Sequence, residues 1–342
     1  MKPKKILVLC LRYLGDTLLT RPVLRALSLQ FPQTQIDILI PQGTEVALEH
    51  FPYSFQILKW PRSQSAALPV LFHIFRQHYD WTIDLTGNDR TALLTLLSHA
   101  KHRISYEKKK PRWQRWRSQL YNIRISHEKK KPHILYQHQK LLETCDVPFQ
   151  GISLELKASQ KAQDTISSLL ALYSDKKILL AHLTSRDMQK SLPISLVREV
   201  LIHLLKQNCA IIFTHGTTLQ EKDYVTQCMQ DFPTTHLKMM PILRWDELIA
   251  LVSKSNAYWG VDTAPTHLAS DLQKPMLVHY GPSNAPQWHP LNPQADIIVS
   301  SCNCLKTKQK LCPESVSGKC FNALSSTSIA SILSKKLFYF NN

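Results

Sequence analysis

Short apolar runs alternate with helix-periodic segments along most of the chain. Lys4–Leu11 is almost continuously apolar, which is typical of a strand buried on both faces. Thr17–Leu29 then has the spacing of an amphipathic helix, and Ile36–Ile40 is a second apolar run. The chain therefore opens with a predicted βαβ unit. Its first turn, at Gly15-Asp16, follows the carboxyl end of the first strand, where active groups of open α/β sheets gather.

The same alternation continues and predicts an α/β protein with parallel sheets. Further strands are predicted at Ile57–Trp60, Trp81–Leu85, Lys177–Ala181, Ala210–Thr214, Asn256–Trp259 and Met276–Tyr280. Further helices are predicted at Ala66–His78, His133–Cys145, Ser159–Tyr173, Leu196–Leu205, Leu219–Asp231, Trp245–Ser253 and Ser325–Leu337. The polar, proline-punctuated stretch from His102 to Pro132 predicts loops.

A length of 342 residues indicates two domains. Val147–Ser159 contains Pro148 and Gly151 and lacks helical periodicity, so we place the join there. The expected architecture is two Rossmann-like halves facing across a cleft. The predicted ranges are 1–158, 159–324 and a C-terminal helix in 325–342 that packs back towards the first domain.

One turn between a strand and a helix combines several anion-binding features. Asp262 or Thr263 is a suitable helix N-cap, and Pro265 fits the first helical turn. The free N–H groups and dipole of such a helix start attract phosphate, and Thr266 and His267 add polar groups. An ordinary capped helix explains the same residues without a ligand.

A second polar loop follows the first strand of the second domain. Thr184 and Ser185 carry hydroxyls, and Arg186 and Lys190 carry positive charge, a combination that suits a diphosphate. A solvated surface loop is the structural alternative. Both loops belong to the same predicted sheet edge, which favours a phosphate site there.

Asp16 is the candidate general base. A carboxylate behind Gly15 at the end of the first strand can take a proton from a hydroxyl nucleophile. It can equally be a simple helix cap. Gly15 is not part of a G-x-G-x-x-G array, so the dinucleotide-binding fingerprint is absent at this turn.

The formal charge of +17 indicates an anionic partner: nucleic acid, an anionic membrane surface or a phosphorylated substrate. The positive charge is concentrated in one region, together with Trp113 and Trp116. Its basic residues are Arg103, Lys108, Lys109, Lys110, Arg112, Arg115, Arg117, Arg124, Lys129, Lys130 and Lys131. A solvated surface needs no function beyond solubility, and this alternative stays open.

The motifs resemble those of glycosyltransferase family 9, the heptosyltransferases. Leu11–Pro22 looks like the family's opening segment, and Gly260–Ala269 followed by Tyr280-Gly281-Pro282 resembles its donor-site signature. His182–Lys190 is similar to the third lipopolysaccharide-core heptosyltransferase in its Thr-to-Lys spacing. These motifs have the family's order and separation over nearly the whole chain.

The resemblance implies a GT-B fold and an inverting transferase that uses ADP-L-glycero-D-manno-heptose. The implied acceptor is inner-core lipopolysaccharide at the cytoplasmic membrane face. Asp16 would be the base, and Lys190 with Thr184 and Ser185 would hold the ADP phosphates. The remaining implied donor-site residues are Arg186, Glu221 (towards the ribose), Asp262, Thr263, Ala264 and His267. The implied acceptor-binding residues are Arg12, Arg103, Lys108, Lys109, Lys110 and Arg112.

Two positions depart from the family pattern. Ala264 stands where the family usually has Gly, and Leu183 replaces a residue that is often Pro or Gly. A methyl group at residue 264 can change how closely the backbone approaches a phosphate. Both departures bear on the placement of the donor and on the identity of its sugar.

No cofactor and no metal site are expected, and no acidic D-x-D pair is found. Cys302, Cys304, Cys312 and Cys320 lack the paired C-x2-C spacing of a zinc site. We interpret them as structural thiols, with zinc as the alternative.

The chain has no apolar segment of the ~20 residues that a membrane helix needs. The sequence therefore predicts a cytoplasmic protein, soluble or peripherally membrane-bound, and the resemblance implies the cytoplasmic face of the inner membrane. The predicted partners are the ADP-heptose donor, the lipopolysaccharide acceptor and an anionic membrane surface, without nucleic acid. The alternatives are another nucleotide sugar or acceptor, a basic nucleic-acid-binding protein, and an inactive scaffold of the same fold.

Overall fold

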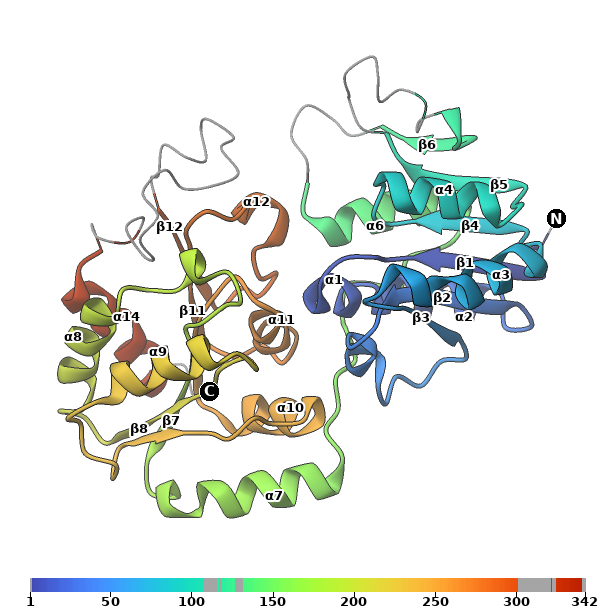
Figure 1. Ribbon diagram of the computed structural model, residues 1–342. Helices are drawn as coiled ribbons and strands as arrows, with labels where there is room; N and C mark the ends of the chain where they lie inside the picture. Colours follow the sequence, from blue (N-terminus) through green and yellow to red (C-terminus); the bar gives the residue numbers. More distant parts are fainter. Residues whose placement is uncertain are drawn as a thin grey trace. The chain divides into compact units, whose positions relative to one another are not determined.

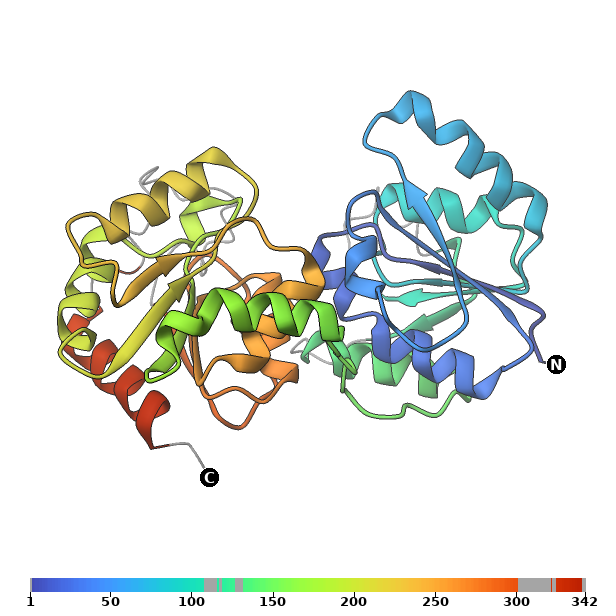
Figure 2. The ribbon, with the colours of Figure 1, turned by 90° about the horizontal axis from the view of Figure 1, so that it is seen from below.

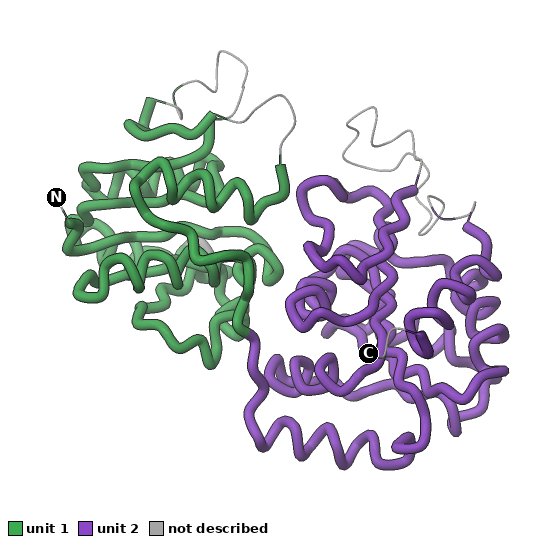
Figure 3. The backbone as a smooth tube through the Cα atoms, turned by 180° about the vertical axis from the view of Figure 1, so that it is seen from behind, with its two compact units in different colours: residues 1–155 green, residues 156–342 purple. Residues whose placement is uncertain are grey.

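The computed structural model describes residues 2–107, 116, 119–126, 132–300, 321 and 324–339. The chain divides into two compact units, residues 1–155 and 156–342 (Figure 3). The division falls inside the predicted join, three residues before the predicted end at residue 158. Lys108–Lys110 and Arg112, as well as the four clustered cysteines, lie outside the described residues.

The first unit is built on a parallel sheet of six described strands in the order β3-β2-β1-β4-β5-β6 (Figure 1). Its strands are β1 Lys5–Leu9, β2 Gln35–Pro41, β3 Gln56–Trp60, β4 Trp81–Asp84, β5 His102–Tyr106 and β6 Ile123–Ile125. Its helices include α1 Leu14–Leu18, α2 Arg21–Gln30, η1 Glu45–Leu48, η2 Gln64–Ala67, α3 Leu68–Gln77, α4 Asp89–Leu97 and α6 Ile134–Glu143.

Side chains of β1 alternate between two cores, one on each face of the sheet. Ile6 and Val8 pack with residues of α2 and α6, whereas Leu7 and Leu9 pack with residues of α3 and α4. The strand is buried on both faces, so its sequence is continuously apolar instead of alternating. This confirms the predicted buried first strand.

The second unit repeats this arrangement, with six described strands in the order β12-β11-β10-β7-β8-β9. Its strands are β7 Lys177–His182, β8 Cys209–Phe213, β9 Leu237–Met239, β10 Ala257–Val261, β11 Met276–Tyr280 and β12 Ala295–Val299. Its helices include α7 Gln160–Leu170, η4 Ala171–Tyr173, η5 Met188–Lys190, α8 Ile194–Leu204, α9 Leu219–Met229, α10 Trp245–Lys254, α11 Ala264–Asp271, α12 Ala285–Trp288 and α14 Ser326–Phe338.

The C-terminal helix α14 belongs to the second unit. Ile329, Leu333 and Leu337 lie in one hydrophobic core with residues of α8, β7 and β10. Lys336 also donates a hydrogen bond to the Gln294 carbonyl and pairs with Asp296. The apolar face of α14 is therefore buried within the second unit.

Two local predictions were wrong. The stretch expected to form loops contains β5 and β6, because Ile104 and Tyr106 reach the core between polar neighbours. The single helix expected over Thr17–Leu29 is two helices, α1 and α2, with Pro22 in the first turn of the second one. Proline at that position lacks the N–H that a continuous helix would use.

The chain leaving the first unit is fixed by a buried arginine of α2. The guanidinium of Arg25 donates to the carbonyls of Gln150, Gly151 and Ser153. It also pairs with the Glu155 carboxylate at 2.8 Å. Four acceptors satisfy a buried charge that would otherwise be costly, so the segment before the boundary is held by the first unit.

We expect Leu333→Ala to lower the free energy of unfolding of the second unit by about 2–5 kcal/mol, because it leaves a cavity in a closed core. Urea unfolding, with hydrogen exchange resolved by unit, measures the change. Lys335→Ala, on the exposed side of the same helix, is the matched control and should change little. Equal effects of the two substitutions would contradict the placement of α14.

Candidate functional site

Both units reverse their strand order at one point, and several candidate residues lie there. In the first unit β1 pairs with β4, with Leu9 opposite Asp84, and in the second β7 pairs with β10, with His182 opposite Gly260. The loops that follow the paired strands diverge to opposite sides of the sheet. Such a switch point at the carboxyl ends of parallel strands is the usual ligand site of open α/β sheets.

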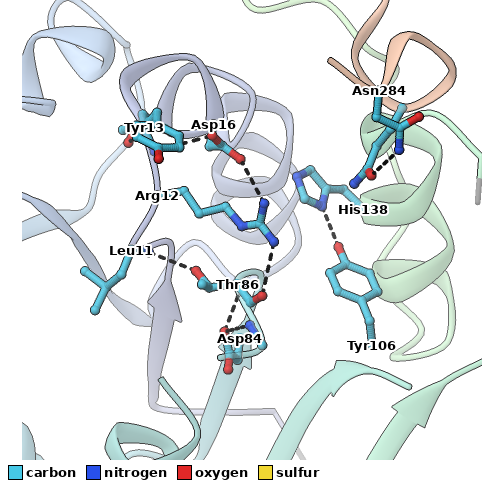
Figure 4. Close-up of polar contacts among 12 residues, drawn as sticks. Leu11, Arg12, Tyr13, Asp16, Asp84, Thr86, Tyr106, His138 and Asn284 are labelled. Atoms are coloured by element: carbon cyan, nitrogen blue, oxygen red, sulfur yellow. Dashed lines mark hydrogen bonds and ion pairs between the residues drawn. The ribbon is translucent and has the colours of Figure 1, made fainter. Parts of the chain in front are cut away.

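Asp16 lies on the short helix α1, directly after β1 (Figure 4). Its carboxylate accepts a 3.3 Å hydrogen bond from the Tyr13 N–H and pairs with the Arg12 guanidinium at 3.6 Å. The side chain keeps 13% of its surface exposed. Asp16 is therefore a helix cap whose carboxylate still reaches solvent, and its role as a base stays a prediction.

The turn after β4 holds this region in place (Figure 4). The Asp84 carboxylate accepts hydrogen bonds from the N–H groups of Thr86 and Gly87 and from the Tyr121 hydroxyl. Thr86 in turn accepts from the Leu11 N–H through its hydroxyl and from Arg12 through its carbonyl. A buried carboxylate thus fixes the turn that positions Arg12 beside Asp16.

Tyr106 and His138 form a second buried pair nearby. The Tyr106 hydroxyl bonds to Nδ1 of His138 (Figure 4), and burial lowers the pKa of His138 to about 3. Burial, aided by the Asp16 charge, also raises the pKa of the Cys10 thiol. The ring of His138 and the thiol are therefore both neutral at pH 7.

In the second unit, Lys190 and Asp262 form the central ion pair. Lys190 Nζ donates to Asp262 Oδ2 at 2.8 Å, which joins the loop after β7 to the loop after β10. His267 lies one turn into α11 and is buried; burial lowers its pKa against an opposing contribution from Asp262. The two predicted anion loops do meet, through their charged side chains.

Glu221 is held between two elements of the same edge. Its carboxylate accepts hydrogen bonds from the Thr218 N–H at 3.3 Å, which closes a capping box at the start of α9, and from the Thr218 hydroxyl at 2.7 Å. It also accepts a longer one from the Thr184 hydroxyl. Gly216 passes so close that a Cβ there would lie 2.2 Å from the carboxylate. Glu221 therefore contacts Thr184, and both of its carboxylate oxygens have partners within the protein.

The start of α11 has the geometry expected from the sequence. Thr263 is the N-cap residue and Pro265 lies in the first turn. The Thr263 hydroxyl turns back to the Val261 carbonyl instead of capping the helix. The first N–H groups of α11 are therefore not capped by the Thr263 side chain.

Not all predicted site residues gather at these two edges. Arg186 is exposed in the loop after β7, and Ser185 accepts a hydrogen bond from the Asp187 N–H. Arg103 lies near the amino end of β5, opposite Thr82 of β4. Its guanidinium donates to the carbonyls of Leu120 and Ala100, so the structure uses it to fix a turn.

Among the described residues, no three His, Cys, Asp or Glu side chains are grouped to hold a metal ion. In the same part of the chain, no helix combines the length and apolar character needed to cross a bilayer.

The sequence profile of glycosyltransferase family 9 (heptosyltransferase) matches residues 71–317. The match covers well over half of the chain. The chain belongs to glycosyltransferase family 9.

Known proteins of this family are similar over most of the chain. Lipopolysaccharide heptosyltransferase 3 of Escherichia coli is 23% identical over 301 residues, covering 82% of this chain and 84% of that protein. The structure of the E. coli ADP-heptose lipopolysaccharide heptosyltransferase II matches with a TM-score of 0.75 at 18% identity, covering 97% and 98% of the two chains.

The E. coli heptosyltransferase WaaC, solved with ADP-2-deoxy-2-fluoro heptose, matches with a TM-score of 0.68 at 18% identity over 97% of this chain and 99% of that one. These structural likenesses confirm the predicted fold class, α/β with the two Rossmann-like units of a GT-B fold.

Ala264, where this chain departs from the family motif, has no backbone strain. The described non-glycine residues with positive φ do not include Ala264, and it is the first residue of α11. A methyl group is therefore compatible with this helix start.

Sequence reasoning did not select His182 as a site residue. Its Nδ1 lies 3.0 Å from the Thr214 hydroxyl, and both residues are buried at the ends of adjacent strands β7 and β8. Burial lowers its pKa to about 4, although the Glu221 charge opposes the shift. The sequence feature that could have identified His182 as a site residue is its position at the end of a strand, immediately before the loop that contains Thr184.

His182 makes the second unit sensitive to acid. Between pH 6.5 and about 4 the unfolded chain binds a proton at His182 that the folded chain does not. Because the unfolded state binds more protons there, stability falls as pH falls, by about 3 kcal/mol over this window. Urea unfolding of His182→Gln at a series of pH values should show a shallower loss.

The loss should not vanish in this variant, because burial also lowers the pKa of His279 in the same unit to about 3. His203→Gln, at a partly exposed position of α8, is the control and should leave the slope unchanged. A slope that is the same in the His182 variant and the parent protein would refute the assignment.

Proposed function

We propose that this protein is an inverting glycosyltransferase that moves a heptose from ADP-L-glycero-D-manno-heptose to a hydroxyl of the lipopolysaccharide inner core. Family membership and the likeness to lipopolysaccharide heptosyltransferase 3 support this reaction class. A related structure was solved with an ADP-heptose analogue, which supports the donor. The proposed place of action is the cytoplasmic face of the inner membrane.

The Lys190–Asp262 ion pair carries the proposal. It brings a positive charge to the start of α11, on the sheet edge where Thr184 is buried against Glu221. A helix start and a lysine together offer N–H donors and charge to a diphosphate. In the proposed complex, Lys190, Thr184, Ser185 and the first N–H groups of α11 bind the ADP phosphates.

The other donor-site roles follow from the contacts around this pair. Glu221, anchored by Thr218, is proposed to accept from the ribose, and Asp262 with His267 is proposed to lie near the sugar and the diphosphate. Thr263, Ala264 and Arg186 complete the proposed donor contacts. His267 is neutral because burial lowers its pKa, so it acts as a hydrogen-bonding group and not as a fixed charge.

Asp16 is the proposed catalytic base. Its carboxylate takes the proton of the acceptor hydroxyl while that oxygen bonds to the anomeric carbon from the face opposite ADP. The bond between the anomeric carbon and the β-phosphate oxygen breaks, and ADP leaves with the electron pair. The transition state resembles an oxocarbenium ion, and the charge that grows on ADP is offset by Lys190 and the helix start.

The acceptor is proposed to meet positive charge in the first unit. Arg12 is held beside Asp16 by the Thr86 carbonyl and can reach the phosphates or carboxylates of an inner-core acceptor. Lys108, Lys109, Lys110 and Arg112 are proposed to add to this contact. Arg103 fits it less well, because its guanidinium already binds two backbone carbonyls.

We expect Asp16→Asn to slow transfer by about 10²–10⁴-fold, the usual contribution of a general base. The measurement is ADP release from ADP-heptose, with core acceptors truncated at successive steps. Asn keeps the shape of the side chain and can still accept from the Tyr13 N–H, so stability should change little.

Asp223→Asn, on the exposed side of α9, is the matched control and should leave the rate unchanged. An unaltered rate in the Asp16 variant would exclude the proposed base. No ADP release by the parent protein with any acceptor would exclude the heptose reaction and leave another nucleotide sugar or acceptor.

Lys190→Met should weaken ADP binding by about tenfold to a hundredfold, because a charged hydrogen bond contributes about 1.5–3 kcal/mol. The substitution also leaves the Asp262 carboxylate unpaired beside the diphosphate. Adding Asp262→Asn should therefore restore part of the affinity. Isothermal titration with ADP measures both effects.

Lys222→Met, at an exposed position of α9, is the control for a general loss of positive charge. If it weakened ADP binding as much as Lys190→Met, the effect would be long-range electrostatics and the direct contact would be wrong.

A further inference from the structure

Helix α3 is apolar on both its inner and its outer face. Ile74, with Val70 and Leu71, packs into the core beneath the helix. Leu68, Phe72 and Phe75 recur at helical spacing on the other side and are 69%, 59% and 44% exposed. A helix at the protein surface normally has a polar outer face, so this outer face is unusual.

Helix α4 continues the same surface. Leu93 and Leu96 are 55% and 52% exposed and lie one turn apart, in line with Arg90. The two helices cover one face of the first sheet side by side (Figures 1 and 2), and the Phe75 ring lies 5.0 Å from the ring of His99, just after α4. We call Leu68, Phe72, Phe75, Leu93 and Leu96 the α3–α4 apolar face.

Cations border this face. Arg76 lies on α3 with its guanidinium 5.3 Å from the Phe72 ring, and Arg90 begins the apolar stripe of α4. From residue 61 to residue 102, the exposed charged side chains are Arg62, Arg76, Arg90, Lys101 and one carboxylate, Asp89. The local excess of positive charge matches the overall charge of +17.

We propose that the α3–α4 apolar face binds the surface of an anionic lipid bilayer. Single exposed apolar residues are ordinary, but five on the adjacent outer stripes of two helices are not. Phenylalanine and leucine enter the boundary between headgroups and acyl chains, while arginine stays at the lipid phosphates. Charge complementarity therefore favours an anionic bilayer over a neutral one.

This surface differs from the basic stretch around Trp113 and Trp116, where the sequence concentrates positive charge. It belongs to helices packed on a face of the sheet, whereas Asp16 lies at the carboxyl edge of its strands. Membrane attachment by this face would leave the Asp16 edge uncovered by the helices that attach. The inference deepens the proposed location of the enzyme and rests on that part of the proposed function.

Co-sedimentation with vesicles tests the inference. The full-length protein is mixed with phosphatidylcholine vesicles or with vesicles that also contain phosphatidylglycerol. We expect binding to the anionic vesicles, weakened at least about tenfold by Phe72→Ser/Phe75→Ser, since two aromatic side chains no longer enter the interface. Arg76→Gln/Arg90→Gln should lower the preference for anionic over neutral vesicles, because it removes two of the bordering charges.

Leu172→Ser/Ile202→Ser is the matched control, because these residues are 82% and 52% exposed in the second unit. It should bind vesicles like the parent protein. Circular dichroism and ADP titration check that each variant is folded. Since vesicle binding needs no donor or acceptor, its outcome is separate from that of the transfer assay.

Two results would overturn the inference. The first is equal vesicle binding by the Phe72/Phe75 variant and the parent protein. The second is a lipid-free dimer in sedimentation velocity that the same variant dissociates, which would assign the face to a second copy of the chain.

Discussion

The reversal of strand order in each parallel sheet is the constraint on which the rest depends. Parallel strands need crossover connections, and where these diverge, two neighbouring carboxyl ends are left without a covering helix. In the first unit this happens between β1 and β4, which places the Asp16 turn beside the Thr86 turn. In the second it happens between β7 and β10, which places the Thr184 loop beside Asp262.

At both points the structure balances charge locally. Asp16 is paired with Arg12, and Lys190 with Asp262, before any substrate is present. In the proposed donor complex, a diphosphate would share or displace Asp262 as the partner of Lys190. Binding would then exchange one charged contact for another.

Much of this follows from local sequence. The apolar run that contains Leu7 and Leu9 predicts a buried strand, and the structure buries it. Thr263 and Pro265 predict a helix start, and α11 begins there. Local sequence also favours Asp16 and Lys190, since each closely follows a buried strand. It does not find β5, where Ile104 and Tyr106 are separated by Ser105 and flanked by polar residues, and where pairing with β4 places them in the core.

The sequence by itself determined the α/β class, the two units and the residue types at each strand end, because these depend on patterns within a few residues. Only the tertiary structure decided which of these residues meet. It linked Lys190 to Asp262, separated by 72 positions, and Asp84 to Tyr121, separated by 37. It also placed the Arg103 guanidinium against a backbone carbonyl of a turn, and it packed α14 within the second unit. Such pairings depend on strand order and core packing, which bring distant segments together and leave no signature in the neighbouring sequence.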